Sequence, residues 1–183
     1  MKTSNWILLI LFALAVGTYF LVKHTQANKP SEATPTPSAF YLIQENDTVL
    51  KKFRLQGADG RVLELERNQD GFWQILQPER AEAEQWKVSA MESQLGSLMV
   101  NTQLGNVANF GDFGLDAPTY LLHLEYYNGV KHKIEVGKLT PTKSGYYVRL
   151  DDGGVYVIPQ YSLDPILELL DNPPYQPTPT PTP

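Results

Sequence analysis

Few side chains of this chain have the types and spacing to do chemistry, and two histidines in its central part come first. His123 and His132 flank Asn128-Gly129, a dipeptide typical of β-hairpin turns. Because side chains alternate between the faces of a strand, His132 should share a face with Ile134, and His123 with Glu125. One metal ion cannot reach both faces. We therefore predict a solvated His123, a hydrogen-bonded His132 and no metal site.

The acidic side chains do not indicate a reaction either. Asp151-Asp152-Gly153-Gly154 has too few acids for the oxygen cage of Ca²⁺, so we expect a hairpin turn there. Asp112-Phe113-Gly114 matches a kinase magnesium motif, but the loops that accompany that motif are missing. Glu64 and Glu125 could serve an enzyme only if the fold brought them together in a cleft. An enzyme is the weakest hypothesis, and we predict no catalytic residue and no cofactor.

Composition excludes further classes of protein. The 183 residues include no cysteine, which rules out disulfides, Cys-ligated metals and thiol nucleophiles. The chain has 15 Lys+Arg against 20 Asp+Glu, a balance that argues against nucleic acid as a partner. Tyrosines remain as the enriched feature. Tyr127 and Tyr147 fall on strand faces opposite Leu124 and Val148, so we expect them to be exposed and able to bind a protein or a glycan.

Alternating apolar and polar residues predict the elements that position these side chains. The expected strands cover residues 49–56, 63–67, 72–76, 122–127, 130–136, 146–150 and 155–158. One helix should start in the acidic run 79–84 and end near Val100, and a second should start at Asp164-Pro165. The two halves repeat the same order of elements. This predicts an α+β fold, an antiparallel sheet built from two related hairpin–strand–helix units with helices on one face.

The N-terminus predicts a membrane anchor. Residues 6–22 contain no charge and have about the minimum length, ~17 residues, of a helix that crosses the ~30 Å hydrocarbon core. A signal peptide cleaved after Ala27 remains the alternative, although its apolar region would be unusually long. Lys and Arg counts do not settle the orientation, but an anchor, a spacer and then a domain is the usual order of an exported, tethered protein. We expect a single-pass membrane protein with the domain extracytoplasmic.

Proline-rich segments bound the predicted domain on both sides. The expected organisation is residues 1–5 as an N-terminal tip, 6–22 as the transmembrane anchor, 23–39 as a Pro/Thr-rich linker, 40–172 as the globular domain and 173–183 as a disordered Thr-Pro tail. Proline removes a backbone donor, so the Thr-Pro segments should be extended spacers. O-glycosylation of the threonines, or docking of the tail into a proline-reading groove, stay open as alternatives.

One run of residues resembles a known family. Phe110-Gly111-Asp112-Phe113-Gly114-Leu115-Asp116-Ala117-Pro118 leads into an alternating strand, and Gly145-Tyr146-Tyr147 and Val155-Tyr156-Val157-Ile158 follow. The order of these motifs resembles the domain-of-unknown-function 4340 family over roughly Val49 to Leu170. The resemblance implies an anchored bacterial envelope protein with an extracytoplasmic domain. Some members are associated with ABC-type export or gliding-motility systems, and no catalytic residues are established that could be carried over.

The residues of this run also have a physical interpretation as a structural corner. Gly111 and Gly114 allow backbone angles that are closed to other residues, and Leu115 can fill the core. Asp116 and Pro118 force an extended entry into the next strand. The favoured hypothesis is therefore a membrane-anchored, non-catalytic interaction or accessory domain with a protein partner in the envelope. A glycan- or cell-wall-binding module that uses exposed tyrosines is the alternative.

Overall fold

A computed structural model describes Tyr19 and residues 40–43 and 49–177. By its contacts the chain divides into Met1–Ser38 and Ala39–Pro183, and the fold below is that of the second unit. Apart from the helical Tyr19, the predicted anchor and linker lie outside the described residues. No helix within the described ranges has the length and apolarity needed to cross a membrane.

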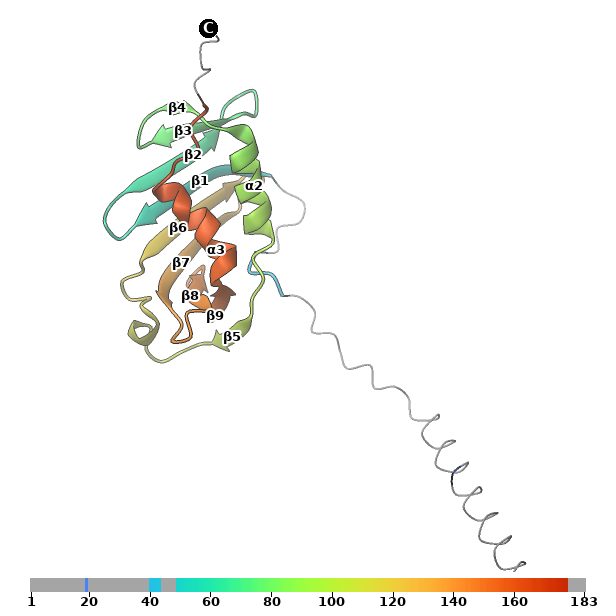
Figure 1. Cartoon of the computed structure of the whole chain (residues 1–183), viewed down its shortest axis with the longest axis vertical. Helices are drawn as coiled ribbons and strands as arrows, with labels where there is room; N and C mark the ends of the chain where they lie inside the picture. The colour runs from blue at the N-terminus through green and yellow to red at the C-terminus, as the bar shows by residue number, and fades with distance from the viewer. Residues whose placement is uncertain (1–18, 20–39, 44–48, 178–183) are drawn as a thin grey trace, which may run out of the picture. The chain divides into compact units, whose positions relative to one another are not determined.

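The domain is built on one antiparallel sheet, which Figure 1 shows with its strands labelled. In the described part of the chain the strand order is β4-β3-β2-β1-β6-β7-β8-β9-β5. The strands are β1 Leu50–Gly57, β2 Val62–Arg67, β3 Trp73–Gln77, β4 Ala81–Glu82, β5 Thr102–Gly105, β6 Tyr120–Tyr126, β7 Lys131–Leu139, β8 Gly145–Leu150 and β9 Val155–Pro159. The helices are α2 Gln85–Gly96 and α3 Gln160–Leu167, with short 3₁₀ turns η1 Gly111–Phe113 and η2 Glu168–Leu170.

The two halves of the chain meet at the centre of this sheet. Strands β1 to β4 extend to one side and β6 to β9 to the other, so the first strands of the halves, β1 and β6, are antiparallel neighbours. Each half ends in one helix, α2 or α3.

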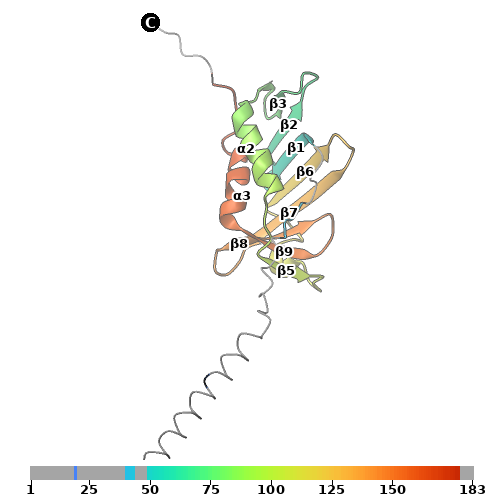
Figure 2. The same cartoon turned by 90° about the vertical axis from the view of Figure 1, so that its right-hand side faces the viewer.

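Alternation along the strands separates a buried face from a polar one. Phe53 and Leu55 of β1 are fully buried, and they pair with Leu124 and Leu122 of β6. Both helices cover this face, as the side view in Figure 2 shows. They bury Val88, Met91 and Leu95 from α2, and Leu163, Ile166 and Leu167 from α3. The α+β prediction is confirmed: an antiparallel sheet carries its helices on one face.

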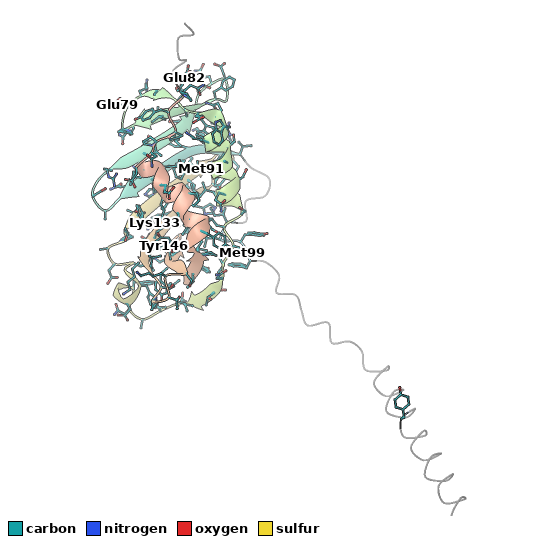
Figure 3. All side chains as sticks on the ribbon, viewed as in Figure 1. Glu79, Glu82, Met91, Met99, Lys133 and Tyr146 are labelled. Carbon is teal, nitrogen blue, oxygen red and sulfur yellow. The ribbon has the colours of Figure 1, made fainter. Side chains whose placement is uncertain are left out.

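The first helix begins later than the sequence indicates. Instead of starting the helix, the acidic run 79–84 contains β4, whose Ala81 and Glu82 pair with Ile75 and Gln74 of β3. Figure 3 shows Glu79 and Glu82 at this edge of the sheet. The helix starts at Gln85 and ends at Gly96, before the predicted end near Val100. Acidic residues are favourable at a helix N-terminus because of the helix dipole, but charged side chains are also common on strands near the edge of a sheet.

The second helix was predicted to start at Asp164-Pro165, and this is wrong. The helix begins at Gln160, directly after the extended backbone of Pro159, and Pro165 lies inside it. Asp164 has another role, because its carboxylate accepts a hydrogen bond of 2.8 Å from the Tyr146 hydroxyl on β8. Burial and this hydrogen bond raise the pKa of Tyr146. The contact joins α3 to the sheet.

The C-terminal tail enters the fold further than predicted. Tyr175 forms a β-bridge with Ala83, and the Gln176 N–H donates to the Glu82 carbonyl at 3.0 Å. The Pro174 carbonyl accepts from the Glu84 N–H at 2.7 Å. A proline has no donor but keeps its acceptor, so a proline-rich segment can still pair where its non-proline residues supply the N–H groups. The domain therefore extends at least to Gln176, and residues 178–183 lie outside the described ranges.

Candidate functional site

The face of the sheet opposite the helices contains a depression. Its volume is about 320 Å³, and strands β1, β6 and β7 form its floor. The lining residues are Lys52, Arg54, His123, Leu124, Glu125, Lys131, His132, Lys133 and Asp151. No helix covers this side of the sheet in Figure 2. We call this side of the sheet the open face.

Ion pairs hold the β1 side of the depression in place. Glu64 of β2 accepts from Lys52 and Arg54, each at 2.7 Å, and its side chain is only 12% exposed. The hydrogen bond from Lys52 holds the pKa of Glu64 below its ordinary value, and the same bond raises the pKa of Lys52. The two cations are therefore held at fixed positions by one nearly buried carboxylate.

A second carboxylate, on the other side of β1, forms ion pairs with two lysines. Glu125 of β6 forms ion pairs with Lys131 at 3.2 Å and with Lys51 at 3.4 Å. The hydrogen bond from Lys131 is the main cause that lowers the pKa of Glu125. Glu64 and Glu125 thus lie across β1 from each other, each occupied by its own cations. Both carboxyl groups have a lowered pKa and stay ionised at neutral pH, so each of them holds its cations in place.

The two histidines lie on opposite faces, as their spacing predicts. His123 pairs with Lys133 and is exposed, whereas His132 pairs with Leu124, has the parity of the buried residues, and contributes to the lining of the depression where it contacts Asp151. Although the residue is exposed, neighbouring protein atoms exclude part of the water around its ring, and this desolvation, together with the charges of Arg54 and Lys133, lowers the pKa of His123. In the described ranges no cluster of three or more His, Cys, Asp or Glu has the arrangement of a metal site.

Acids of the β8–β9 turn close one end of the open face. Asp151 accepts from His132 Nδ1 at 2.6 Å and from the Lys133 N–H at 2.7 Å. Asp152 accepts from Lys133 Nζ at 2.8 Å, and this bond lowers the pKa of its carboxyl. Asp151 and Asp152 both have positive φ, 49° and 59°, which the residues of a tight hairpin turn adopt. Their oxygens accept hydrogen bonds from the neighbouring strand β7, and the backbone forms the predicted hairpin turn.

Further along β7 the open face is covered by the predicted corner. Glu135 is 7% exposed and is paired with Arg149 of β8 and with Lys133 at 3.2 Å. The Arg149 guanidinium lies 4.5 Å from the centre of the Phe110 ring, so the salt bridge is capped by an aromatic side chain. The hydrogen bond to Glu135 raises the pKa of Arg149.

The residues of the corner have different structural roles. Gly114 has φ 72°, a left-handed conformation, and Leu115 is only 2% exposed. Gly111 does not have a positive φ, contrary to expectation; a Cβ there would instead lie 2.8 Å from an Asp116 carboxylate oxygen. Pro118 lies two residues before β6. Gly114 is therefore required by its backbone angle, whereas a Cβ at Gly111 would meet side-chain atoms of Asp116 and Asn109, which can move aside.

Tyr127 and Tyr147 do not form one surface. Tyr127 is 55% exposed beside the β6–β7 turn, whereas the ring of Tyr147 is partly covered by Phe113, edge to face at 4.9 Å. In the register of the sheet, Tyr127 lies beside Val130 and Tyr147 lies beside Gly137, close to opposite ends of β7. At ~3.3 Å per residue this separates the two tyrosines by roughly 20 Å. The expected exposed pair is wrong for Tyr147.

A second depression lies near the other edge of the sheet. It has a volume of about 280 Å³. It is lined by Asn68, Phe72, Trp73, Gln74, Glu82, Ala83, Gln85 and Gln176. Phe72 is 59% exposed, and the C-terminal segment supplies Gln176. The sequence does not indicate this group, because Gln176 joins the other lining residues only through the pairing of the C-terminal segment with Glu82 and Ala83.

The cations of the open face were also missed as a group. Alternation places Lys52, Arg54 and Lys133 on the solvent side of their strands, but the sequence does not show that β1 lies between β2 and β6. That neighbourhood brings Glu64 and Glu125 to the two sides of β1.

Comparison with known proteins completes this description. The sequence model of the family described as "Domain of unknown function (DUF4340)" matches residues 73–172. The chain belongs to this family. The DUF4340 match runs from the start of β3 to just beyond η2, so it contains the corner and the whole second half but begins later than Val49, where the resemblance was expected to start. No curated protein and no solved structure matches the chain.

Proposed function

We propose that this DUF4340 protein is a membrane-anchored, extracytoplasmic interaction domain that binds a protein of the cell envelope and is not an enzyme. The observation that carries the proposal is the open face of the sheet. It has a depression of about 320 Å³ and polar side chains held in fixed positions by ion pairs. Such preorganised charges lower the ordering cost of an interface.

The arrangement of charge on the open face favours a protein as the partner. Glu64, Lys52, Glu125 and Lys131 alternate in sign from β2 to β7. A surface of alternating sign creates no strong field of one sign, which polyanions such as nucleic acids require. It can instead match a protein surface with the complementary pattern, and charge complementarity gives specificity and association rate.

The sequence supports the membrane and envelope parts of the proposal. The uncharged residues 6–22 are long enough for one crossing, and the proline-rich residues 23–39 separate them from the domain. Membership of DUF4340 assigns no reaction. The resemblance that led to the family implies envelope complexes, so a subunit of an ABC-type export complex is the partner class that we propose to test first.

Partner capture from native membranes tests the proposal. The full-length chain would be purified as wild type, as Lys131→Glu on the open face and as Lys87→Glu on α2. Lys131 and Lys87 each have one carboxylate partner, Glu125 and Glu84, and the charge change is the same. We expect one envelope protein to return with the wild type and with Lys87→Glu, and to be lost with Lys131→Glu. Recovery of the chain alone, or equal recovery with both variants, would contradict the proposal.

The location can be tested separately because the chain has no native cysteine. A Tyr127→Cys variant carries its thiol on a side chain that is 55% exposed. We expect a membrane-impermeant maleimide to label this variant on cells whose outer membrane is permeabilised and whose inner membrane is intact. Labelling that requires cell lysis would refute an extracytoplasmic domain.

The depression beside the C-terminal segment supports glycan binding as a second candidate. Its lining combines amide side chains, the Glu82 carboxylate and the exposed ring of Phe72. Amides and carboxylates can hydrogen-bond the hydroxyl groups of a sugar, and an aromatic ring can stack against its apolar face. This site replaces the tyrosine pair as the place to look for a glycan. Retention on insoluble cell wall that Phe72→Ala abolishes and Tyr127→Ala leaves intact would favour it.

A further inference from the structure

The edge of the sheet at β5 differs from the rest of the surface because it lacks charge. Three segments meet at this edge, and none of them contains Asp, Glu, Lys or Arg: residues 40–43, 97–105 and 153–159. In the chain as a whole 19% of residues are charged. The segments are joined by backbone hydrogen bonds: Val100 N–H donates to the Phe40 carbonyl at 2.7 Å, and β5 pairs with β9.

Large apolar side chains are exposed on this uncharged edge. Phe40, Tyr41, Met99 and Leu104 are each between 37% and 42% exposed. Tyr41 and Met99 form a β-bridge, and the ring of Phe40 stacks on Tyr156 of β9 at 6.1 Å. Figure 3 shows Met99 on the rim of the domain, below α2. We call these four exposed side chains the apolar edge.

The place where the chain enters the domain indicates what the apolar edge meets. Phe40 is both the first described residue of the domain and a member of the apolar edge. Residues 23–39 separate it from the uncharged segment 6–22, and an extended linker of this length spans at most ~50 Å. Tethering at this point keeps the edge at a high local concentration near the bilayer surface.

We propose that the apolar edge rests on the lipid bilayer to which the chain is anchored, an inference that depends on the proposed anchor. Phe, Tyr, Met and Leu are side chains that insert into the boundary between headgroups and acyl chains. The domain is acidic overall, so its uncharged edge is the part that approaches anionic headgroups without repulsion. A second copy pairing through β5 is a poorer fit, because β5 has only four residues and an irregular register at Gly105.

Resting on the bilayer would orient the domain. The edge strand β5 is the last strand of the sheet on one side, and β4 is the last on the other. With β5 against the lipid, each following strand of the sheet lies farther from the membrane, and β4 lies farthest. The open face is then presented sideways, where a membrane-embedded partner can reach it.

Site-specific spin labelling of the full-length protein tests this inference. Single variants Leu104→Cys and Phe72→Cys would be labelled and placed in vesicles of phosphatidylethanolamine and phosphatidylglycerol. Phe72 is the matched control, an exposed apolar side chain next to β3, near the other edge of the sheet. The measured quantity is the accessibility of each label to oxygen relative to a water-soluble nickel chelate. We expect this ratio to be several-fold higher at residue 104 than at residue 72, and to fall to the control level when Tyr41→Asp is added.

The possible outcomes separate the anchor from the apolar edge. If the protein floats with the vesicles but both labels have the same ratio, the anchor stands and the resting edge is refuted. If the protein does not float with the vesicles, the proposed anchor fails, and the inference fails with it. If the label at residue 104 is shielded from both reagents and couples to a second label, a second copy covers the edge and the lipid contact is refuted.

Discussion

Replacing Gly137 by alanine tests how the corner 110–118 packs on the sheet. Gly137 is buried in β7, and a Cβ added there would lie 2.2 Å from the Phe113 carbonyl oxygen and 3.2 Å from the carbonyl carbon and oxygen of Gly114. The nearest atom belongs to the backbone, so no rotation of a side chain relieves the contact. The corner would have to move by about 1 Å, and overpacking of this kind costs about 1–3 kcal/mol.

Equilibrium unfolding in urea measures this cost. Tryptophan fluorescence reports loss of the core, because Trp73 is only 1% exposed in the fold and becomes hydrated on unfolding. Each kcal/mol should also lower the thermal midpoint by about 2–4 °C in a domain of this size. Gly96→Ala is the matched control, because no atom lies within 4 Å of its added Cβ and the residue is helical. There we expect no loss, or a gain of up to ~1 kcal/mol.

An unchanged midpoint for Gly137→Ala would show that the corner does not lie against β7. Gly114→Ala refines the test, since Gly114 has φ 72° and its Cβ would lie 3.0 Å from the Lys138 nitrogen. A left-handed alanine costs about 1–2 kcal/mol. Destabilisation at Gly137 without any at Gly114 would contradict the conformation of the corner.

Three further predictions concern stability. Tyr146→Phe removes the hydrogen bond to Asp164 and should lower the free energy of unfolding by about 1 kcal/mol in urea titrations. Glu135→Gln removes the charge that Arg149 and a lysine share at a nearly buried position, with an expected loss of about 2 kcal/mol by the same assay. The pKa of Glu64 is lower in the folded domain than its ordinary 4.5. The ionised Glu64 therefore stabilises the fold fully above pH 4.5, and this contribution is lost as the pH falls through the folded pKa. Glu64→Gln should make the thermal midpoint less dependent on pH in this acid range.

The sheet could be predicted where alternation is strong. In β1 the apolar residues Phe53 and Leu55 alternate with Arg54 and Gln56, because one face is buried and the other meets water. Strand β5 has no such signal, since all but the last of its residues are exposed and none is charged. The start of α2 was missed because acids favour a helix N-terminus locally, whereas Ala81 and Glu82 pair with β3. The start of α3 was missed because Asp164-Pro165 resembles a helix start but lies inside a helix that begins at Gln160.

The open face could be predicted only as a list of polar residues. Parity places Lys52 and Glu125 on the solvent side of their strands. They become cross-strand partners only because β1 and β6, which are distant in sequence, are neighbours in the sheet. The second depression depends on a bridge between Tyr175 and Ala83 that a proline-rich tail does not suggest. Alternation along one strand predicts which side chains face solvent, whereas the residues that line a depression depend on which strands are neighbours in the sheet.

Photo-crosslinking in native membranes tests the central claim most directly. A photoreactive residue would replace Lys131 on the open face, where the side chain is 70% exposed, or Tyr161 on α3, which is 72% exposed. If the open face binds an envelope protein, Lys131 should give one crosslinked envelope protein, identified by mass spectrometry, and Tyr161 should give none. A crosslink from Tyr161 with Lys131 silent, or no crosslink from either position, would contradict the account.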